Sequence, residues 1–294
     1  MQWNFKGSGV ALVTPFDDNN QINYSKLQEL VDYHIEQKTD ALVVAGTTGE
    51  ASTLSVEEHK DLIRESVKMA KGRIPVIAGT GSNETPLAIE LSQQAEEVGA
   101  DGLLLVTPYY NKTNTVGLIK HYEAVAEAVT IPMILYNVPG RTGMNISLEA
   151  MVTLSQHERI VGVKEASGDI SYASEVARLC GEDFVIVSGN DDVIVPMMAI
   201  GATGVISVVA NILPKMTHDI TAHFLDGNLK AALDLQLQHN ALINSLFYET
   251  NPIPVKTAMN LMGWEVGELR LPLYEMADAP KVKMIAELKK INLL

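Results

Sequence analysis

The feature that most constrains this chain is a short apolar run followed by a stretch of helical periodicity, repeated eight times. The runs are rich in Val, Ile, Leu and Ala, and they begin near residues 9, 40, 74, 101, 131, 160, 184 and 203. They are continuously apolar rather than alternating, which is typical of strands covered on both faces. The pattern therefore predicts an α/β protein with a buried sheet.

Stretches with the period of an amphipathic helix separate these runs. The clearest is 55–71, where Ser55 and Glu58 have the spacing of a capping box and Leu62 and Val67 fall on one face. Further helices are predicted at 23–37, 85–98, 115–128, 147–155, 170–180, 191–199 and 212–224.

Eight strand and helix units of roughly 20 to 35 residues are typical of a closed (β/α)8 barrel, or TIM barrel, of about 250 residues. A doubly wound open sheet is the alternative, but the units are even in size and no glycine-rich dinucleotide motif follows the first strand. Helices alone are predicted near the end, at 228–248, 253–262 and 280–291. We therefore predict a barrel over 1–226 that carries the active site, and an appended helical region over 227–294.

Composition and charge argue against several classes of function. The net charge is -14 and the basic residues are scattered, so no nucleic-acid partner is expected. The single cysteine, Cys180, fits a reducing compartment, and the first apolar stretch is too short for a signal peptide, so a cytoplasmic location is expected. The uncharged segment 193–213 is long enough to span a bilayer, but Pro196, Gly201 and Gly204 interrupt it and favour buried elements over a membrane span.

A lysine stands at the end of the sixth run, "IVGVK". Active sites of such barrels lie at the C-terminal ends of the strands, so Lys164 is a candidate catalytic residue. Among apolar strands an amine loses the solvation of its charged form, so its pKa falls below about 10.4 and the neutral amine can form a Schiff base with a carbonyl group. Pairing with Glu165 or capping of the barrel rim is the alternative role.

Other polar residues follow the ends of neighbouring strands. Tyr136 ends the fifth run and Tyr110 follows the fourth, so both phenols are candidates for proton transfer at the barrel mouth. Thr47 and Thr48 lie in "GTTGE", a turn whose N–H groups and hydroxyls can bind a carboxylate. Arg141, in the loop after the fifth strand, can bind a second carboxylate. Each also has a simpler explanation. The tyrosines could be half-buried packing residues, "GTTGE" could be an ordinary β-turn, and Arg141 could be a solvated surface arginine.

No metal site is expected. The seven histidines show no H-x-x-x-H or Cys/His spacing and mostly fall on predicted helices. The segment "GTGSN" lacks the lysine and the length of a Walker phosphate loop.

Together these segments resemble the dihydrodipicolinate synthase (4-hydroxy-tetrahydrodipicolinate synthase) family, within the N-acetylneuraminate lyase superfamily of class I aldolases. The matching segments occur in family order over nearly the whole chain: "GTTGE", "PVIAGTGSN", "TPYYN", "YNVPGRTG", "GVKEASG", "SGND" and "GVISV". The resemblance implies that Lys164 forms a Schiff base with pyruvate. It also implies a proton relay of Thr47, Tyr136 and Tyr110, in which Tyr110 reaches into the site of a neighbouring subunit.

The resemblance also implies the substrate contacts. Thr48 would hold the pyruvate carboxylate, Arg141 would bind the carboxylate of L-aspartate 4-semialdehyde, and Gly189 and Ile206 would line the pocket. The product would be 4-hydroxy-tetrahydrodipicolinate, on the route to diaminopimelate and lysine. No external cofactor would be needed, and the expected assembly is a homotetramer built as a dimer of dimers.

The sequence departs from one part of the family pattern. His59, Asn83 and Tyr109 match the polar set that lysine-inhibited members use at their tight-dimer interface, so they are possible remnants of an effector site. Apolar residues stand where such members often have serine, histidine and glutamate: Ala51, Val56 and Leu87. Because hydrogen bonds to a charged ligand are each worth about 1 to 3 kcal/mol, weak or absent inhibition by lysine is expected.

Two alternatives share parts of this pattern. Another pyruvate-dependent aldolase, such as N-acetylneuraminate lyase or a 2-keto-3-deoxy-sugar-acid aldolase, would keep Lys164 and Tyr136 but would not need Arg141. A catalytically silent barrel that binds metabolites would be expected to lack at least one of Lys164, Tyr136, Tyr110 and Thr47, and all four are present.

Overall fold

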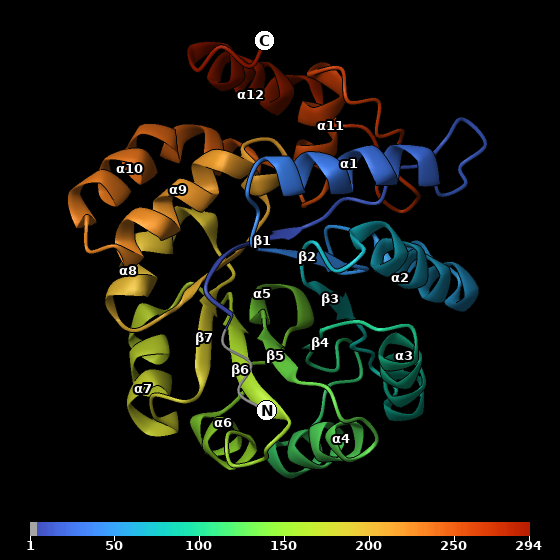
Figure 1. Ribbon diagram of the computed structural model, residues 1–294, viewed down its shortest axis with the longest axis vertical. Helices are drawn as coiled ribbons and strands as arrows, with labels where there is room; N and C mark the ends of the chain where they lie inside the picture. The colour runs from blue at the N-terminus through green and yellow to red at the C-terminus, as the bar shows by residue number, and fades with distance from the viewer. Residues whose placement is uncertain (1–4) are drawn as a thin grey trace.

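The computed structural model describes residues 5–294 and contains a closed barrel of eight parallel strands in chain order, β1 pairing with β8 (Figure 1). The (β/α)8 prediction is therefore confirmed. The strands are β1 (Gly7–Ala11), β2 (Ala41–Val44), β3 (Val76–Gly79), β4 (Gly102–Val106), β5 (Met133–Asn137), β6 (Ile160–Glu165), β7 (Val185–Ser188) and β8 (Gly204–Ser207).

Helices surround the barrel, and a C-terminal group lies at one side of it, beside α1 (Figure 1). Around the barrel are α1 (Tyr24–Glu36), α2 (Val56–Ala70), α3 (Thr85–Glu97), α4 (Thr115–Glu127), α6 (Leu148–Leu154), α7 (Ile170–Cys180), α8 (Ile194–Ala199) and α9 (Pro214–Leu225). The short α5 (Pro139–Thr142) lies inside this ring (Figure 1), and its residues Arg141 and Thr142 line a cavity. The C-terminal group comprises α10 (Leu229–Ser245), α11 (Ile253–Leu261) and α12 (Asp278–Lys290). Three 3-10 turns complete the described chain: η1 (Ala51–Thr53), η2 (Asp191–Val193) and η3 (Val209–Asn211).

Apolar side chains of the strands form two layers, because successive residues of a strand point to opposite faces. On β5, Ile134 and Tyr136 belong to the cluster inside the barrel, whereas Met133 and Leu135 pack in the larger cluster beneath the helices. Tyr136 is also the direct partner of Lys164 in the register of β5 and β6. The two residues are therefore placed side by side at the C-terminal ends of adjacent strands.

The uncharged segment 193–213 folds as α8, β8 and η3, as the punctuation by proline and glycine predicts. Within residues 5–294, no helix has both the length and the apolar character needed to cross a membrane.

Some element boundaries differ from the prediction. The helix predicted at 191–199 begins instead as the 3-10 turn η2, whose first residue, Asp191, accepts hydrogen bonds from the N–H groups of Val208 and Val209. A short helix, α5, begins at Pro139 where only a loop was expected. Position 226 lies between α9 and α10, and the division into two domains at this point stays a prediction.

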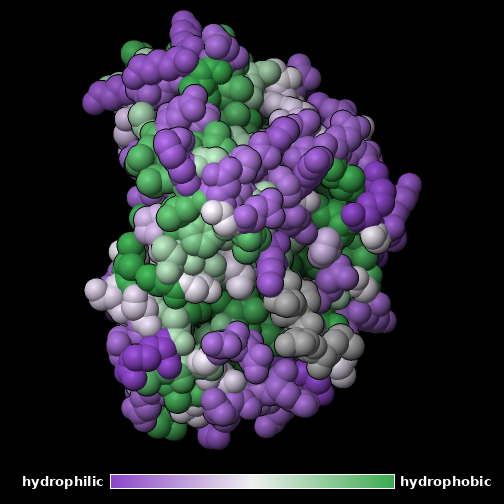
Figure 2. Space-filling model, turned by 60° about the vertical axis from the view of Figure 1, so that its left-hand side comes forward, coloured by the Kyte–Doolittle hydropathy of each residue, from purple (hydrophilic) through white to green (hydrophobic). Residues whose placement is uncertain are grey.

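One side of the molecule exposes an apolar row on α10. Leu229, Leu233 and Leu237 follow one another at intervals of four residues, so they share a face of the helix, and all three are exposed. Figure 2 brings the side of α7, α8 and α10 forward and shows apolar residues between hydrophilic ones on this face.

Candidate active site

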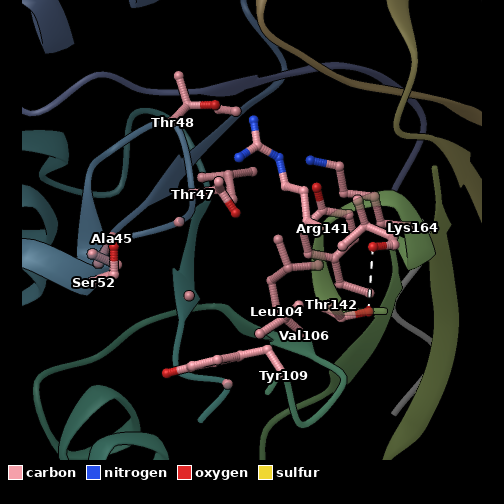
Figure 3. Close-up of a pocket in the computed structure, with 18 of the residues that line it drawn as sticks. Ala45, Thr47, Thr48, Ser52, Leu104, Val106, Tyr109, Arg141, Thr142 and Lys164 are labelled. Atoms are coloured by element: carbon pink, nitrogen blue, oxygen red, sulfur yellow. Dashed lines mark hydrogen bonds between the residues drawn. The ribbon is translucent and has the colours of Figure 1, made fainter. Parts of the chain in front are cut away.

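A cavity of about 530 Å³ lies where the residues that follow the strand ends converge (Figure 3). Most of the residues predicted from the sequence line it: Thr47, Thr48, His59, Tyr109, Tyr136, Arg141, Lys164 and Gly189. The cavity also takes in residues that the sequence did not single out, among them Val138, Phe247 and Asn251.

Lys164 is buried at the tip of β6, with only 5% of its surface exposed. Its Nζ lies 4.4 Å from the centre of the Tyr136 ring. Burial lowers the pKa of Lys164 to about 8, and Arg141 adds to the lowering while Asp191 opposes it. Roughly a tenth of the amine is therefore neutral near pH 7, far more than for a solvated lysine, and the neutral amine is the form that attacks a carbonyl carbon.

The alternative role of Lys164, an ion pair with Glu165, is wrong. The Glu165 carboxylate accepts hydrogen bonds from the Asn137 amide at 2.8 Å and from the Ser167 backbone N–H at 2.6 Å. No ion pair joins Lys164 to Glu165 among residues 5–294. Lys164 is thus free to face the cavity.

Tyr136 provides a proton donor next to this amine. Burial raises the pKa of Tyr136, and a hydrogen bond with the Thr47 side chain partly offsets the rise. The phenol is therefore protonated near neutral pH and connected to a second hydroxyl group. Tyr136 and Thr47 form two members of a chain along which a proton can pass to and from a group on Lys164.

Two groups suited to carboxylates face the same cavity, and both contact Asn251. The Asn251 side-chain amide donates a hydrogen bond to Thr48 Oγ1 at 2.9 Å. The Arg141 guanidinium donates to the Asn251 backbone carbonyl, also at 2.9 Å. The sequence does not single out Asn251, because no local pattern indicates a contact with a residue 203 positions away.

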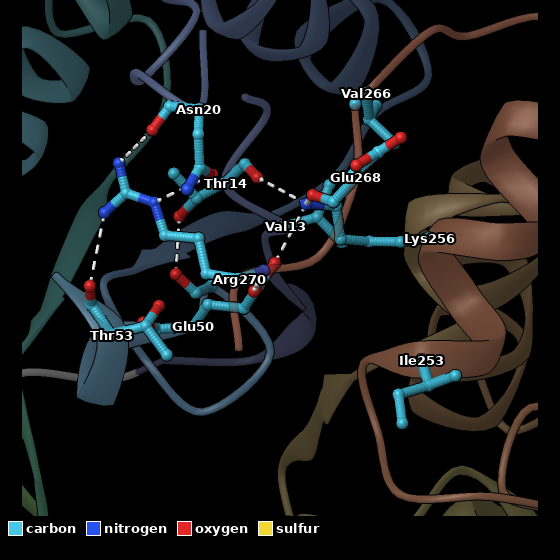
Figure 4. Close-up of polar contacts among 12 residues, drawn as sticks. Val13, Thr14, Asn20, Glu50, Thr53, Ile253, Lys256, Val266, Glu268 and Arg270 are labelled. Carbon is cyan, nitrogen blue, oxygen red and sulfur yellow. Dashed lines mark hydrogen bonds and ion pairs between the residues drawn. The ribbon is translucent and has the colours of Figure 1, made fainter. Parts of the chain in front are cut away.

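The turn that carries Thr47 and Thr48 is supported from the C-terminal region by a buried ion pair (Figure 4). Lys256 of α11 donates to the Glu50 carboxylate at 2.8 Å and to the backbone carbonyls of Thr14 at 3.2 Å and Glu268 at 2.7 Å. The backbone N–H of Arg270 donates to the other Glu50 oxygen at 3.0 Å. Burial lowers the pKa of Lys256, and Glu50 opposes that shift.

Gly189 is placed where a side chain would disturb the lysine. A Cβ atom built on Gly189 would lie 3.1 Å from Lys164 Cε and 2.5 Å from Ala166 Cβ. A glycine at the end of β7 therefore leaves the Lys164 side chain the space in which it extends into the cavity.

Three predicted site residues lie outside the cavity: Tyr110, Ile206 and Asn83. Tyr110 is 90% exposed and does not line it, so the expectation that both phenols reach the mouth of one barrel is met only by Tyr136. Ile206 is fully buried in the cluster inside the barrel rather than in the cavity wall. Its alternation along β8 points it into the packed layer below the site.

The possible effector residues lie at one end of the cavity. His59 donates from Nε2 to the Gly79 carbonyl at 2.7 Å, and burial lowers its pKa. The Asn83 side chain donates to the Tyr109 carbonyl at 3.2 Å but does not itself line the cavity. The apolar residues noted in the sequence line it beside His59: Ala51, Val56 and Leu87. In the described part of the chain, no group of three or more His, Cys, Asp or Glu residues is placed to hold a metal ion.

Comparison with known proteins covers nearly the whole chain. The model of the dihydrodipicolinate synthetase family matches residues 4–291. A 4-hydroxy-tetrahydrodipicolinate synthase of Thermoanaerobacter is 53% identical over 99% of this chain and 98% of its own, and that of Clostridium tetani is 55% identical over 94% of each. The crystal structure of a dihydrodipicolinate synthase from Acinetobacter baumannii, in complex with pyruvate, has a TM-score of 0.96 at 44% identity, covering 99% of this chain and 100% of that one.

Proposed function

Because the chain belongs to the dihydrodipicolinate synthetase family, we propose that it is a 4-hydroxy-tetrahydrodipicolinate synthase, which condenses pyruvate with L-aspartate 4-semialdehyde. The observation that carries the proposal is the buried Lys164 amine, in contact with the Tyr136 ring, in a cavity that also holds Thr48 and Arg141. This set provides a nucleophile, a proton donor and two places for carboxylates.

The first half of the reaction joins pyruvate to the protein. The neutral Lys164 amine adds to the C2 carbonyl, the oxygen is protonated and water leaves, which gives an imine. Tyr136 supplies the proton, and Thr47 passes a replacement along its hydrogen bond to the phenol. The Thr48 hydroxyl and the N–H groups of the "GTTGE" turn hold the pyruvate carboxylate during these steps.

The second half forms the new carbon–carbon bond. The imine withdraws electrons, so a proton leaves C3 and the resulting enamine attacks the aldehyde carbon of the semialdehyde. Arg141 holds the carboxylate of this second substrate. The amino group of the semialdehyde then adds to C2, and as the ring closes the Lys164 amine leaves. All atoms balance with protons alone, so no cofactor is required.

The central step is tested by trapping the imine. Incubation with pyruvate and borohydride should add one reduced pyruvate to the intact protein, and peptide mapping should place it on Lys164. The Lys164→Ala variant should gain no such mass. An adduct on another lysine, or none on the unaltered protein, would contradict the proposal.

The second substrate is tested by competition between acceptors. With pyruvate present, L-aspartate 4-semialdehyde should be consumed and N-acetylmannosamine should not. Arg141→Ala should raise the KM for the semialdehyde far more than the KM for pyruvate, because Arg141 is assigned to the second carboxylate only. Preference for the sugar would instead favour a sugar-acid aldolase.

We also propose that the protein works in the cytoplasm as a homotetramer. Tyr110 is exposed at the end of its loop, and the leucine row of α10 leaves apolar surface uncovered in a single chain. Such surface is commonly buried by a second copy of the same chain.

A further inference from the structure

Asn251 joins the two carboxylate-binding groups of the site although it lies in the C-terminal region. It precedes α11, lines the cavity and has only 5% of its surface exposed. Its side chain bonds to Thr48 and its backbone carbonyl to Arg141. A single residue thus contacts the groups assigned to the first and to the second substrate.

The direction of the bond to Thr48 decides what the hydroxyl can do. A hydroxyl has one hydrogen to donate and two lone pairs to accept with. Because the Asn251 amide N–H donates to Thr48 Oγ1, it occupies a lone pair and leaves the hydroxyl hydrogen free. Among residues 5–294, no acceptor takes that hydrogen. Thr48 is 3% exposed and lines the cavity, so the hydroxyl hydrogen is available to an acceptor that enters the cavity.

We propose that Asn251 is a positioning residue that fixes the Thr48 hydroxyl as a hydrogen-bond donor to the pyruvate carboxylate. The proposal rests on the proposed function, since it concerns the binding of the same keto acid. Asn251 acts through Thr48, and its carbonyl meanwhile holds one N–H of Arg141 and leaves the remaining guanidinium N–H groups for the second carboxylate.

The Asn251→Asp variant tests the direction of the bond while keeping the shape of the side chain. An aspartate can only accept here, so the Thr48 hydroxyl should turn to donate to it and be lost to pyruvate. The KM for pyruvate, and the pyruvate concentration that half-saturates imine trapping, should each rise about tenfold, which matches one hydrogen bond to a charged group. Turnover at saturating substrates should change little, because the reacting groups are untouched.

A double-mutant cycle separates orientation from simple charge repulsion, since an aspartate also repels the anion directly. In a Thr48→Val background there is no hydroxyl to orient. If Asn251 acts through Thr48, Asn251→Asp should change the half-saturating pyruvate concentration much less in this background than it does when threonine is present. Repulsion alone predicts the same fold-change in both backgrounds, and that result would overturn the proposal.

Two further variants complete the experiment. Asn251→Ala removes the donor without adding charge and should raise half-saturation by a smaller factor, since the hydroxyl is then free to rotate. Asn244→Asp makes the same amide-to-carboxylate change at an exposed position of α10 and should leave half-saturation unchanged. Thermal unfolding of each variant checks that the fold is kept.

The outcomes distinguish this proposal from the function on which it rests. If the unaltered protein forms no pyruvate adduct, the proposed function fails. If it forms the adduct on Lys164 and Asn251→Asp leaves half-saturation unchanged, the function stands and the positioning role is overturned.

Discussion

At the scale of single residues, the site depends on Lys164 and Tyr136, which lie side by side at the ends of β6 and β5. Lys164 and Tyr136 were found because strand ends in a barrel converge, and register pairs them directly. Ile206 faces the inside of the barrel, as Tyr136 does, but lies outside the cavity wall, because alternation along a strand gives the face of a side chain and not its depth in the barrel. Asn251 was missed because its partner, Thr48, is distant in the chain and only the closed fold brings them together.

The pH dependence of imine formation follows from the burial of Lys164. Its pKa is lowered to about 8, and only the neutral amine reacts. Below that pKa the neutral fraction falls tenfold for each pH unit, so the rate of borohydride trapping at low pyruvate should rise with pH and level off above about 8. Rapid-mixing measurements across the pH range test this. A rate that kept rising toward the ordinary lysine pKa of about 10.4 would show that the amine is solvated.

Inhibition by lysine should be weak. Ala51, Val56 and Leu87 give the end of the cavity beside His59 an apolar wall, so a bound lysine would find few partners for its ammonium and carboxylate groups. Each missing charge-assisted bond costs about 1 to 3 kcal/mol of affinity. Titration of the condensation reaction with L-lysine checks this, and half-inhibition well below millimolar would contradict it.

At the scale of elements, apolar runs and helical periodicity predict the strands and most helices. They do not predict the long-range contacts that hold these elements in place. The run before Lys164 reads as a strand by itself, but nothing near Glu50 in the chain indicates that Lys256 will enter beneath its turn. Asp191, in the 3-10 turn after β7, likewise binds backbone N–H groups that follow β8, and nothing near it in the chain indicates this contact. Local sequence therefore predicts the elements better than the contacts that hold them.

Removal of the Lys256 charge should destabilise the protein strongly. Lys256→Met leaves Glu50 buried without its partner, which typically costs about 3 to 5 kcal/mol of unfolding free energy. Urea denaturation measures the loss. Adding Glu50→Gln to the same chain should recover part of it, because the uncompensated charge is then gone.

A matched control is available on α10. Lys230 forms an ion pair with Asp234, and both side chains are largely exposed. Lys230→Met should shift the urea midpoint very little, since exposed pairs contribute little to stability. Equal losses at positions 230 and 256 would show that burial of the Glu50 pair does not matter.

At the scale of the whole molecule, one chain holds an incomplete set of the expected proton-transfer groups. Tyr110 has a positive φ of 70°, is largely exposed and does not line the cavity of its own chain. We therefore propose that Tyr110 enters the cavity of a neighbouring copy. Sequence alone gives no direction for such a loop, because exposure in one chain and burial in an assembly depend on the partner.

Mixed assemblies test whether Tyr110 acts across subunits. Lys164→Ala and Tyr110→Phe chains should each be nearly inactive alone. When they are unfolded and refolded together, a cavity with an intact Lys164 can receive an intact Tyr110 from the other chain, so activity should reappear. No recovery, with mixed assemblies shown by mass spectrometry, would place Tyr110 in its own chain or outside the reaction.

Residues in and next to α11 contact the "GTTGE" turn, which lies about 200 positions earlier in the chain. These contacts limit how genes for such proteins can recombine. A crossover between the first barrel units and the C-terminal helices would leave the reacting residues Lys164, Tyr136 and Thr47 present in the chimaera. It would nevertheless separate Glu50 from Lys256 and Thr48 from Asn251, which are inherited together only when both ends of the chain come from one parent. Chimaeras of diverged parents should thus fold and bind substrate only where both parents carry compatible residues at these paired positions.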